Sequence, residues 1–399
     1  MRRTPVDGAF PSFITPLSPV NAEIRRCPVP REKASKRILL VKLLAYGDCI
    51  MASPLVRALR EAYPEAYITW MVERKYLQAV DANPDIDEIL VWEGSYWQDL
   101  LPGRWKKWLD IPKRRLGTRW LVQAWKLRQQ LQQRRFDVLI SMHPEKWRSL
   151  PAATGAAVSI GVFETRPGRE KFYNFTHRKE ALPAHRTDQY LTPLASLGLS
   201  TAVSKQLVLG FTAEDAEAAN ALLEQQGHSK DQPFVVLSAV TTSETRNWPP
   251  ERYVQLGDAL AHLGYRVALI SSPHPKEREV VSKIAAQMQT LPLLALGVLT
   301  FRQMAALLAR ASLIVCGDTG PMHVAAAVGT PYLALFGSTP TLSRAPQAGR
   351  GLCLAHAVPC GPCDKDFCTQ SGENTLRCLK LISVEETLAA ADKLLRFAA

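Results

Sequence analysis

Three loops of this sequence carry acidic, hydroxyl and basic side chains in positions where an enzyme could use them. The first loop, LAYGD (44–48), follows the apolar run RILLVKL and precedes a helix-like stretch. Gly47 permits a close turn, and Asp48 stands at the expected start of the helix. A carboxylate there could act as a general base that takes a proton from a hydroxyl group. Aspartate is also a favoured helix N-cap, so a purely structural role fits these residues as well.

The second loop is TTSETRNWPP (241–250), after the apolar run FVVLS. Thr241 and Thr242 offer hydroxyl and amide donors. Arg246 offers a planar cation that suits a phosphate group or a leaving diphosphate. A polar loop with an exposed arginine is the alternative interpretation.

The third loop, CGDTGPMH (316–323), resembles a phosphate cradle, although it matches neither G-x-G-x-x-G nor the P-loop motif. Amides from Thr319 and Gly320 onward would face an anion at a helix N-terminus. His323 could reach back to a phosphate oxygen, or it could be a buried histidine with satisfied hydrogen bonds. Asp318 would repel phosphate, so we expect it to accept hydrogen bonds from sugar hydroxyls.

The elements that must position these loops alternate between short apolar runs and helical patterns, in two series. Such alternation predicts parallel sheets with crossover helices. Ligands bind beyond the carboxyl ends of the strands in sheets of this kind, and all three loops follow expected strands. The expected strands are 37–43, 67–72, 86–92, 136–141 and 157–160, then 234–238, 265–271, 293–296, 313–316 and 332–336. The expected helices are 49–62, 73–81, 249–263, 275–288, 301–309, 321–328 and 384–397.

We therefore predict an α/β protein with two Rossmann-like domains, 37–210 and 233–350, and a linker or helix over 211–232. Residues 1–36 are expected to form a flexible extension, because they contain six prolines and lack the apolar centre of a secretory signal. Residues 351–399 hold a cysteine-rich segment and a terminal helix, which we expect to pack back on the first domain.

The net charge of +12 is concentrated in one stretch, which we call the basic Trp-rich segment (104–135). It holds eleven Lys and Arg residues against one acid, Asp110, and it contains Trp105, Trp108, Trp120 and Trp125. Tryptophan among basic side chains suits the headgroup zone of an anionic membrane. A nucleic acid is the competing partner, and a solvated basic helix is the structural alternative. No apolar run approaches the roughly 20 residues of a membrane-spanning helix, so a cytoplasmic protein is expected.

Taken together, these loops resemble the ADP-heptose:lipopolysaccharide heptosyltransferases of glycosyltransferase family nine, which have the GT-B fold of two Rossmann-like domains facing across a cleft. The resemblance runs from about residue 37 to 340. It is carried by four segments: GDCIMASPLVRALREAYPEAYITWMVE (47–73), NPDIDEIL (83–90), TTSETRNWPPERY (241–253) and GDTGPMHVAAAVGTPYLALFGSTP (317–340).

The resemblance implies inverting transfer of heptose from ADP-heptose to a lipopolysaccharide inner-core acceptor, with no metal ion needed for transfer. Asp48 would be the base and Asp318 would hold the heptose. Family members usually have lysine where this chain has Arg246, so the positive charge is kept while its shape changes. The donor phosphates would contact Thr241, Thr242, Thr319, Gly320 and His323.

Further expectations follow from the same resemblance. Glu277, in the loop SSPHPKERE (271–279), is the candidate for binding the donor ribose. The acceptor would be an anionic lipid-linked saccharide, the enzyme would sit on the inner face of the inner membrane, and nucleic acid is not expected as a partner. A heptosyltransferase with an autotransporter-type protein acceptor and a non-catalytic nucleotide-sugar binder remain alternatives. The expected acceptor-binding residues are Arg57, Arg60, Lys146 and Arg148.

Four late cysteines have the spacing C-x2-C-x4-C-x9-C. Four thiolates at this spacing could close around one structural zinc or iron ion. The heptosyltransferases that act on autotransporter proteins carry a cysteine-bound iron, and the resemblance implies that the late cysteines of this chain could do the same. Reduced free thiols or a disulfide are the alternatives. The cysteines are Cys360, Cys363, Cys368 and Cys378.

Overall fold

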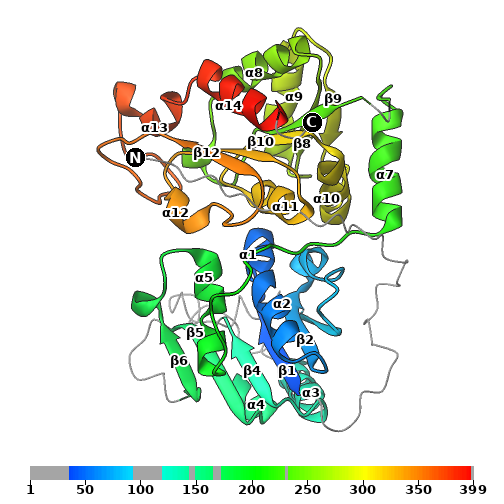
Figure 1. The fold of residues 1–399 in the computed structure, drawn as a ribbon, viewed down its shortest axis with the longest axis vertical. Coiled ribbons are helices and arrows are strands. Elements are labelled where there is room, and N and C mark those ends of the chain that lie inside the picture. The colour runs from blue at the N-terminus through cyan, green and yellow to red at the C-terminus, as the bar shows by residue number, and fades with distance from the viewer. Residues whose placement is uncertain (1–35, 93–118, 143–148, 165–171, 230–231, 397–399) are drawn as a thin grey trace.

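A computed structural model describes residues 36–92, 119–142, 149–164, 172–229 and 232–396. The described residues form two parallel sheets of six strands each, one above the other in Figure 1. The first sheet contains β1 (Arg37–Val41), β2 (Tyr67–Glu73), β3 (Glu88–Trp92), β4 (Val138–Ser141), β5 (Val158–Glu164) and β6 (Phe175–Arg178). The second contains β7 (Phe234–Ser238), β8 (Arg266–Ser271), β9 (Leu293–Leu296), β10 (Leu313–Gly317), β11 (Tyr332–Phe336) and β12 (Gly351–Ala355).

Both sheets have the same doubly wound topology. The strand orders are β3-β2-β1-β4-β5-β6 and β12-β11-β10-β7-β8-β9. In each, the order reverses at one pair of neighbouring strands, β1 with β4 and β7 with β10. Ligands bind in the crevice beyond the strand ends at such a reversal. The expected α/β fold with two Rossmann-like sheets is therefore confirmed. The three loops follow β1, β7 and β10, which are strands at the two reversals.

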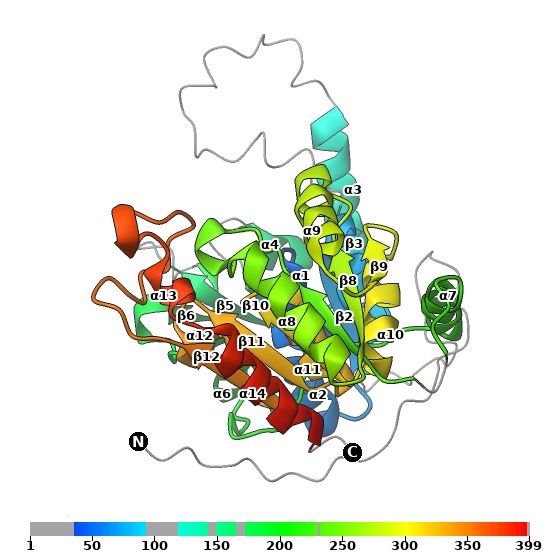
Figure 2. The ribbon, with the colours of Figure 1, turned by 90° about the horizontal axis from the view of Figure 1, so that it is seen from above.

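Helices cover the faces of both sheets (Figures 1 and 2). This explains the nearly unbroken apolar strands, because a parallel sheet is buried on both faces. The helices of the first domain are α1 (Tyr46–Met51), α2 (Ser53–Ala62), α3 (Arg119–Gln133), α4 (Leu150–Thr154), α5 (Arg186–Leu191) and α6 (Pro193–Ser196). Those that follow are α7 (Ala213–Glu224), α8 (Pro250–His262), α9 (Pro275–Gln287), α10 (Phe301–Arg310), α11 (Gly320–Val328), α12 (Thr341–Arg344), α13 (Arg377–Lys380) and α14 (Val384–Arg396).

The cores of the two domains join across their interface. One continuous cluster contains Ile38 and Leu40 of β1 together with Val236 of β7 and Ile314 of β10. At the same interface α1 packs against α11, and Arg302 of α10 forms a 2.6 Å ion pair with Asp81 of the first domain. The carboxyl ends of the strands in the two sheets therefore face the same interface, through the helices that follow β1 and β10.

The terminal helix is the main correction to the expected arrangement. We expected it to pack back on the first domain, but α14 contacts α8, β10, β11 and β12 of the second domain. Ala391, Leu394 and Leu395 are buried there beside Val235 and Leu333. The physical reason is β12, which continues the second sheet beyond residue 350 and leaves an apolar face that α14 covers (Figure 1).

Other differences are local. Residues 74–79 (Arg74–Ala79) form a 3-10 helix where an α-helix was expected, and β6 and β12 were not anticipated. The sequence of β6, FTHR, has no buried position and so gives no apolar signal. Within the basic Trp-rich segment, α3 begins at Arg119, and residues 104–118 lie outside the described ranges. No helix in those ranges is long and apolar enough to cross a membrane.

Candidate active site

The first and third loops meet where the two domains touch. A Cβ atom on Gly47 would lie 2.9 Å from Cδ2 of His323, so any other residue would force His323 or the backbone to shift. The contact sets α1, which begins after β1, against α11, which begins after β10 (Figure 1). Asp48 and the GDTG segment therefore face one site at the domain interface.

Asp48 lies in the first turn of α1 and does not cap it, because the N-cap is Ala45. Ala45 itself has φ 66°, a conformation that L-residues rarely adopt and that often accompanies functional sites. The Oδ2 atom of Asp48 is 3.3 Å from Nζ of Lys42, which is only 3% exposed. Burial by itself would raise the pKa of Asp48, but the charges of Lys42 and Arg186 and hydrogen bonds from Lys42 and Tyr190 lower it. The carboxylate is thus ionised at neutral pH and able to accept a proton.

On the other side of the interface, Asp318 follows β10 directly and is 5% exposed. The guanidinium of Arg246 approaches it at 3.7 Å. Within the described part of the chain, Oδ2 of Asp318 and Nε of Arg246 are buried without a hydrogen-bond partner. Buried polar atoms are nearly always satisfied, so this pair has capacity for a ligand or for water.

His323 lies between the two domains and is 4% exposed. Burial lowers its pKa to about 4, although the nearby carboxylates of Asp318 and Asp48 act in the opposite direction. The ring is therefore neutral at pH 7. Its Nδ1 atom has no hydrogen-bond partner among the described residues. A neutral imidazole in this place can exchange one hydrogen bond with a bound ligand without adding charge.

The second loop packs against the third at Gly317, where a Cβ atom would lie 2.5 Å from the backbone oxygen of Arg246. Thr241 is buried, and its hydroxyl donates to the Ser243 carbonyl at 2.9 Å. Its backbone N–H donates to Asn247 at 2.7 Å. Thr242, in contrast, is exposed. The loop thus has an internally bonded frame at Thr241 and a free hydroxyl at Thr242.

The N-terminus of α11 is open toward the interface. Thr319 is the N-cap in extended conformation, and its side chain makes no capping hydrogen bond. Gly320 begins the helix, and no atom lies within 4 Å of the place where a Cβ would be. The space beside Gly320 is thus open at the start of a nine-residue helix, and the first-turn amides of a helix can bind an anion.

The remaining predicted site residues are less clearly part of this site. Glu277 lies in the first turn of α9, beyond β8, and accepts a hydrogen bond from the Ser272 amide at 3.2 Å. Lys146 and Arg148 lie outside the described ranges.

Two of the expected acceptor-binding arginines already have acidic partners. Arg57 pairs with Asp85 at 2.6 Å, and Arg60 pairs with Asp87 at 2.6 Å. Arg60 also donates to the carbonyls of Pro64, Ala66 and Asp85. These contacts fasten α2 to the connection between β2 and β3, which gives Arg60 a structural function.

The cysteine-rich segment folds over the second loop. Ser243 donates to the carboxylate of Asp366, which also lies 3.8 Å from Arg246. The hydroxyl of Thr245 donates to the carbonyl of Lys365, and its amide donates to that of Asp366 at 3.5 Å. A segment far away in the sequence therefore helps to hold Arg246 in place.

The thiols themselves do not gather into a metal site. Burial raises the pKa of Cys378, and the thiols of the other three cysteines add to this, so they lie within electrostatic range of one another. However, nowhere in the described ranges do three or more His, Cys, Asp or Glu side chains form a group that could hold a metal ion. The arrangement gives no support to a structural zinc or iron ion on Cys360, Cys363, Cys368 and Cys378.

Lys42, Tyr190 and Asp366 were not found by sequence reasoning. Lys42 did carry a signal, since it is a lone charge in the apolar run RILLVKL, and a lysine is almost never fully buried without a partner. Tyr190 and Asp366 carried none, because each reaches the site only through the tertiary fold.

Two Rossmann-like domains whose loops beyond the strand ends meet at the domain interface are typical of the GT-B fold of glycosyltransferases. The chain belongs to glycosyltransferase family 9 (heptosyltransferase), whose family model matches residues 124–372. This confirms the resemblance seen in the sequence and establishes the protein as an enzyme of the glycosyltransferase class.

Individual proteins agree with the family. The chain is 25% identical over 317 residues to the lipopolysaccharide core heptosyltransferase OpsX of Haemophilus influenzae, covering 79% of this chain and 82% of OpsX. The crystal structure of the family 9 glycosyl transferase from Veillonella parvula aligns with TM-score 0.73 and 24% identity, covering 92% of this chain and all (100%) of that one. E. coli ADP-heptose lps heptosyltransferase II aligns with TM-score 0.68 and 21% identity, covering 90% and 99%.

Proposed function

We propose that this enzyme transfers heptose from ADP-heptose to a lipopolysaccharide inner-core acceptor with inversion at the anomeric carbon. The observation that carries the proposal is the meeting of Asp48 with Asp318 and His323 at the domain interface, held by the contact of Gly47 with His323. This arrangement allows an acceptor hydroxyl on the first domain to meet a donor on the second. OpsX, a lipopolysaccharide core heptosyltransferase by name, supports the choice of sugar and acceptor.

The second domain would bind the donor. Asp318 would accept hydrogen bonds from heptose hydroxyls, and Glu277 would do so from the ribose. The diphosphate would lie at the N-terminus of α11, against the amides of Thr319 and Gly320 and beside His323. Arg246 and the hydroxyl of Thr242 complete the phosphate contacts. Helix amides and a guanidinium stabilise the negative charge that develops on the leaving group, so transfer needs no metal ion.

The first domain would supply the base. As the acceptor oxygen bonds to the anomeric carbon, Asp48 takes the hydroxyl proton, and the bond from that carbon to the diphosphate oxygen breaks. ADP leaves with the electron pair of that bond. Because the pKa of Asp48 is lowered, the carboxylate is a weak base, and its fixed position against the hydroxyl must supply most of its effect.

A lipid-linked acceptor would place the enzyme on the cytoplasmic face of the inner membrane. The described part of the basic Trp-rich segment supports this, because α3 exposes 57% of Trp125 and also exposes Lys126 and Arg128. Binding to anionic vesicles should weaken as salt rises, since screening weakens interactions between exposed charges. Vesicle binding that does not change with ionic strength would contradict this part of the proposal.

The central test is to incubate the purified enzyme with ADP-heptose and a panel of inner-core acceptors and to follow products by mass spectrometry. We expect one acceptor to gain a heptose. If every core acceptor fails while ADP-heptose still binds, an autotransporter-type protein acceptor is favoured. If transfer occurs only with another nucleotide sugar, the donor assignment is wrong. Donor binding without transfer to any core or protein acceptor would favour the non-catalytic binder.

A further inference from the structure

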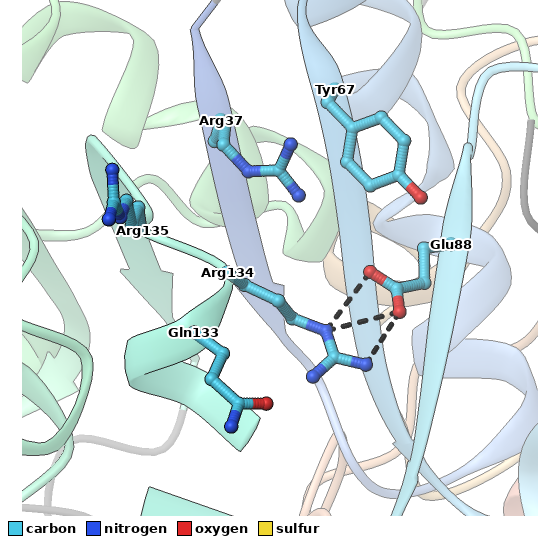
Figure 3. A pocket seen from close by; sticks show the side chains of 6 residues that line it. All are labelled: Arg37, Tyr67, Glu88, Gln133, Arg134 and Arg135. Carbon is cyan, nitrogen blue, oxygen red and sulfur yellow. Dashed lines mark hydrogen bonds and ion pairs between the residues drawn. The ribbon is translucent and has the colours of Figure 1, made fainter. Parts of the chain in front are cut away.

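A second concave site lies at the opposite end of the first sheet, where β1, β2 and β3 begin and α3 ends. The cavity has a volume of about 380 Å³ (Figure 3). It is separated from the end carrying Asp48 by the length of β1, roughly 17 Å for five residues. We call it the arginine pocket, and it is lined by Arg37, Tyr67, Glu88, Gln133, Arg134 and Arg135.

The guanidinium of Arg134, one of the three arginines, already has hydrogen-bond partners within the protein. Arg134 donates from Nε and Nη2 to the carboxylate of Glu88 at 2.7 to 3.1 Å, as the dashed lines in Figure 3 show. Its Nη1 atom donates to the carbonyl of Gln130 at 2.8 Å. The only carboxylate in the lining is therefore neutralised, and the charges of Arg37 and Arg135 remain.

The guanidinium groups of these two arginines have no acidic partner in the part of the chain that the structure describes, and the backbone N–H of Arg37 donates to the carboxylate of Asp137 at 2.7 Å. The guanidinium of Arg37 lies over the ring of Tyr67, 4.5 Å from its centroid. Its Nε atom is buried and makes no hydrogen bond there. A buried guanidinium donor without an acceptor has capacity for a ligand or for water.

The backbone of Arg135 gives an independent reason to look for a ligand. Its φ is 49°, in the left-handed region, just after the end of α3. Glycine is the usual residue at this position, because it adopts that conformation without strain. The side chain of this arginine lines the pocket.

We propose that the arginine pocket binds a phosphate group on the headgroup of an anionic phospholipid. A guanidinium group binds phosphate through two parallel N–H···O hydrogen bonds. In the arginine pocket, the guanidinium groups of Arg37 and Arg135 have no carboxylate partner among the described residues and could bind in this way. A lipid is favoured over a free anion because α3, which supplies Gln133, exposes Trp125 on the same helix. The N-terminal turns of α3 extend beyond α9 in Figure 2. The proposal concerns membrane attachment alone, so it does not depend on which sugar is transferred.

The test uses the full chain and vesicles of phosphatidylcholine with phosphatidic acid, read by co-sedimentation. R37Q and R135N should each raise the apparent Kd about tenfold, as expected for a lost charged hydrogen bond of about 1.4 kcal/mol. The matched control is K393Q, which removes one positive charge from an exposed position of α14 in the second domain and should change the Kd by less than about twofold. Thermal unfolding checks each variant. Asn tolerates left-handed backbone, so R135N tests the pocket even if R37Q fails to fold.

Two results would overturn the proposal. Equal weakening by R37Q, R135N and K393Q would mean that only the overall charge of the protein matters. The second result comes from calorimetry with inorganic phosphate. If free phosphate binds and R37Q and R135N weaken that binding, while the unmodified protein does not bind vesicles, the lipid assignment is wrong.

Discussion

Asp48 and Asp318 occupy corresponding places in two similar domains, yet their surroundings differ. Each follows a strand at the reversal of its sheet, β1 beside β4 and β10 beside β7. Asp48 has the buried ammonium of Lys42 at 3.3 Å. Asp318 has its nearest guanidinium at 3.7 Å, and its Oδ2 atom has no hydrogen-bond partner in the described structure.

The difference indicates a division of work between the domains. The first domain fixes the charge and position of its carboxylate before any ligand binds. The second leaves hydrogen-bonding capacity at Asp318 and Arg246 for a ligand to use. Changes around Asp48 should therefore affect the reaction step, and changes around Asp318 should affect donor binding.

The largest effect is expected for D48A. Removing the base should lower kcat about 10²- to 10⁴-fold, the usual contribution of general base catalysis, with the Kd for donor nearly unchanged. Steady-state transfer assays and calorimetry with ADP-heptose measure the two quantities. D392N, on the exposed side of α14, is the control for a lost carboxylate. If kcat is unchanged in D48A, Asp48 is not the base, and the proposed difference in function between Asp48 and Asp318 is wrong.

D318N should show the opposite pattern. It keeps the shape of the side chain but loses the charge that accepts sugar hydroxyls and attracts Arg246. Donor affinity should fall about tenfold, a typical loss for a hydrogen bond to a charged group, and kcat should change less. If D318N lowers kcat as strongly as D48A while donor affinity is kept, the division of work between the two carboxylates is wrong.

K42M examines how the charge of Asp48 is maintained. With Lys42 removed, burial would raise the pKa of Asp48, and the acidic limb of the pH profile of kcat/KM should move to higher pH. The sign for stability follows. The lowered pKa contributes stability above the ordinary aspartate value, which is lost as pH falls through the folded-state pKa. K42M should show a smaller acid-side loss of stability, because Arg186 and Tyr190 still lower the pKa of Asp48. K283M, which breaks an exposed pair with Glu279, is the control that should leave the pH profile in place.

The sequence predicted the fold well because its signals are local. Of the second sheet, β7, β9 and β11 have the expected bounds, since each is a short buried apolar run between turns. The errors came from tertiary contacts. Nothing in FTHR reveals β6, and the packing of α14 depends on β12, which was not anticipated.

The placement of the predicted site residues follows the same rule. Asp48 follows β1, and Asp318 and His323 follow β10, so topology alone puts each of them at the carboxyl end of its own sheet. The surroundings that set their chemistry come from distant residues. Tyr190 contacts Asp48 from α5, and Asp366 reaches Arg246 from the cysteine-rich segment. Such contacts have no sequence spacing to reveal them.

The smallest effect is expected for D366N, which tests whether the cysteine-rich segment positions Arg246. Asp366 accepts a hydrogen bond from Ser243 and lies 3.8 Å from Arg246, but its side chain is 68% exposed. Exposed pairs contribute little, so donor KM should rise only about two- to threefold with kcat kept. D364N is the matched control, because Asp364 is a nearby carboxylate that pairs with Arg344 at 4.0 Å and not with Arg246.

Asp366 acts through Arg246, so its effect should depend on that residue. In an R246A background, D366N should change donor KM no further, as a double-mutant cycle measures. Equal effects of D366N with and without Arg246 would mean that Asp366 only stabilises the loop. In that case the second domain would owe its donor affinity to the loops after β7 and β10 alone, and the cysteine-rich segment would have no part in the difference between Asp48 and Asp318.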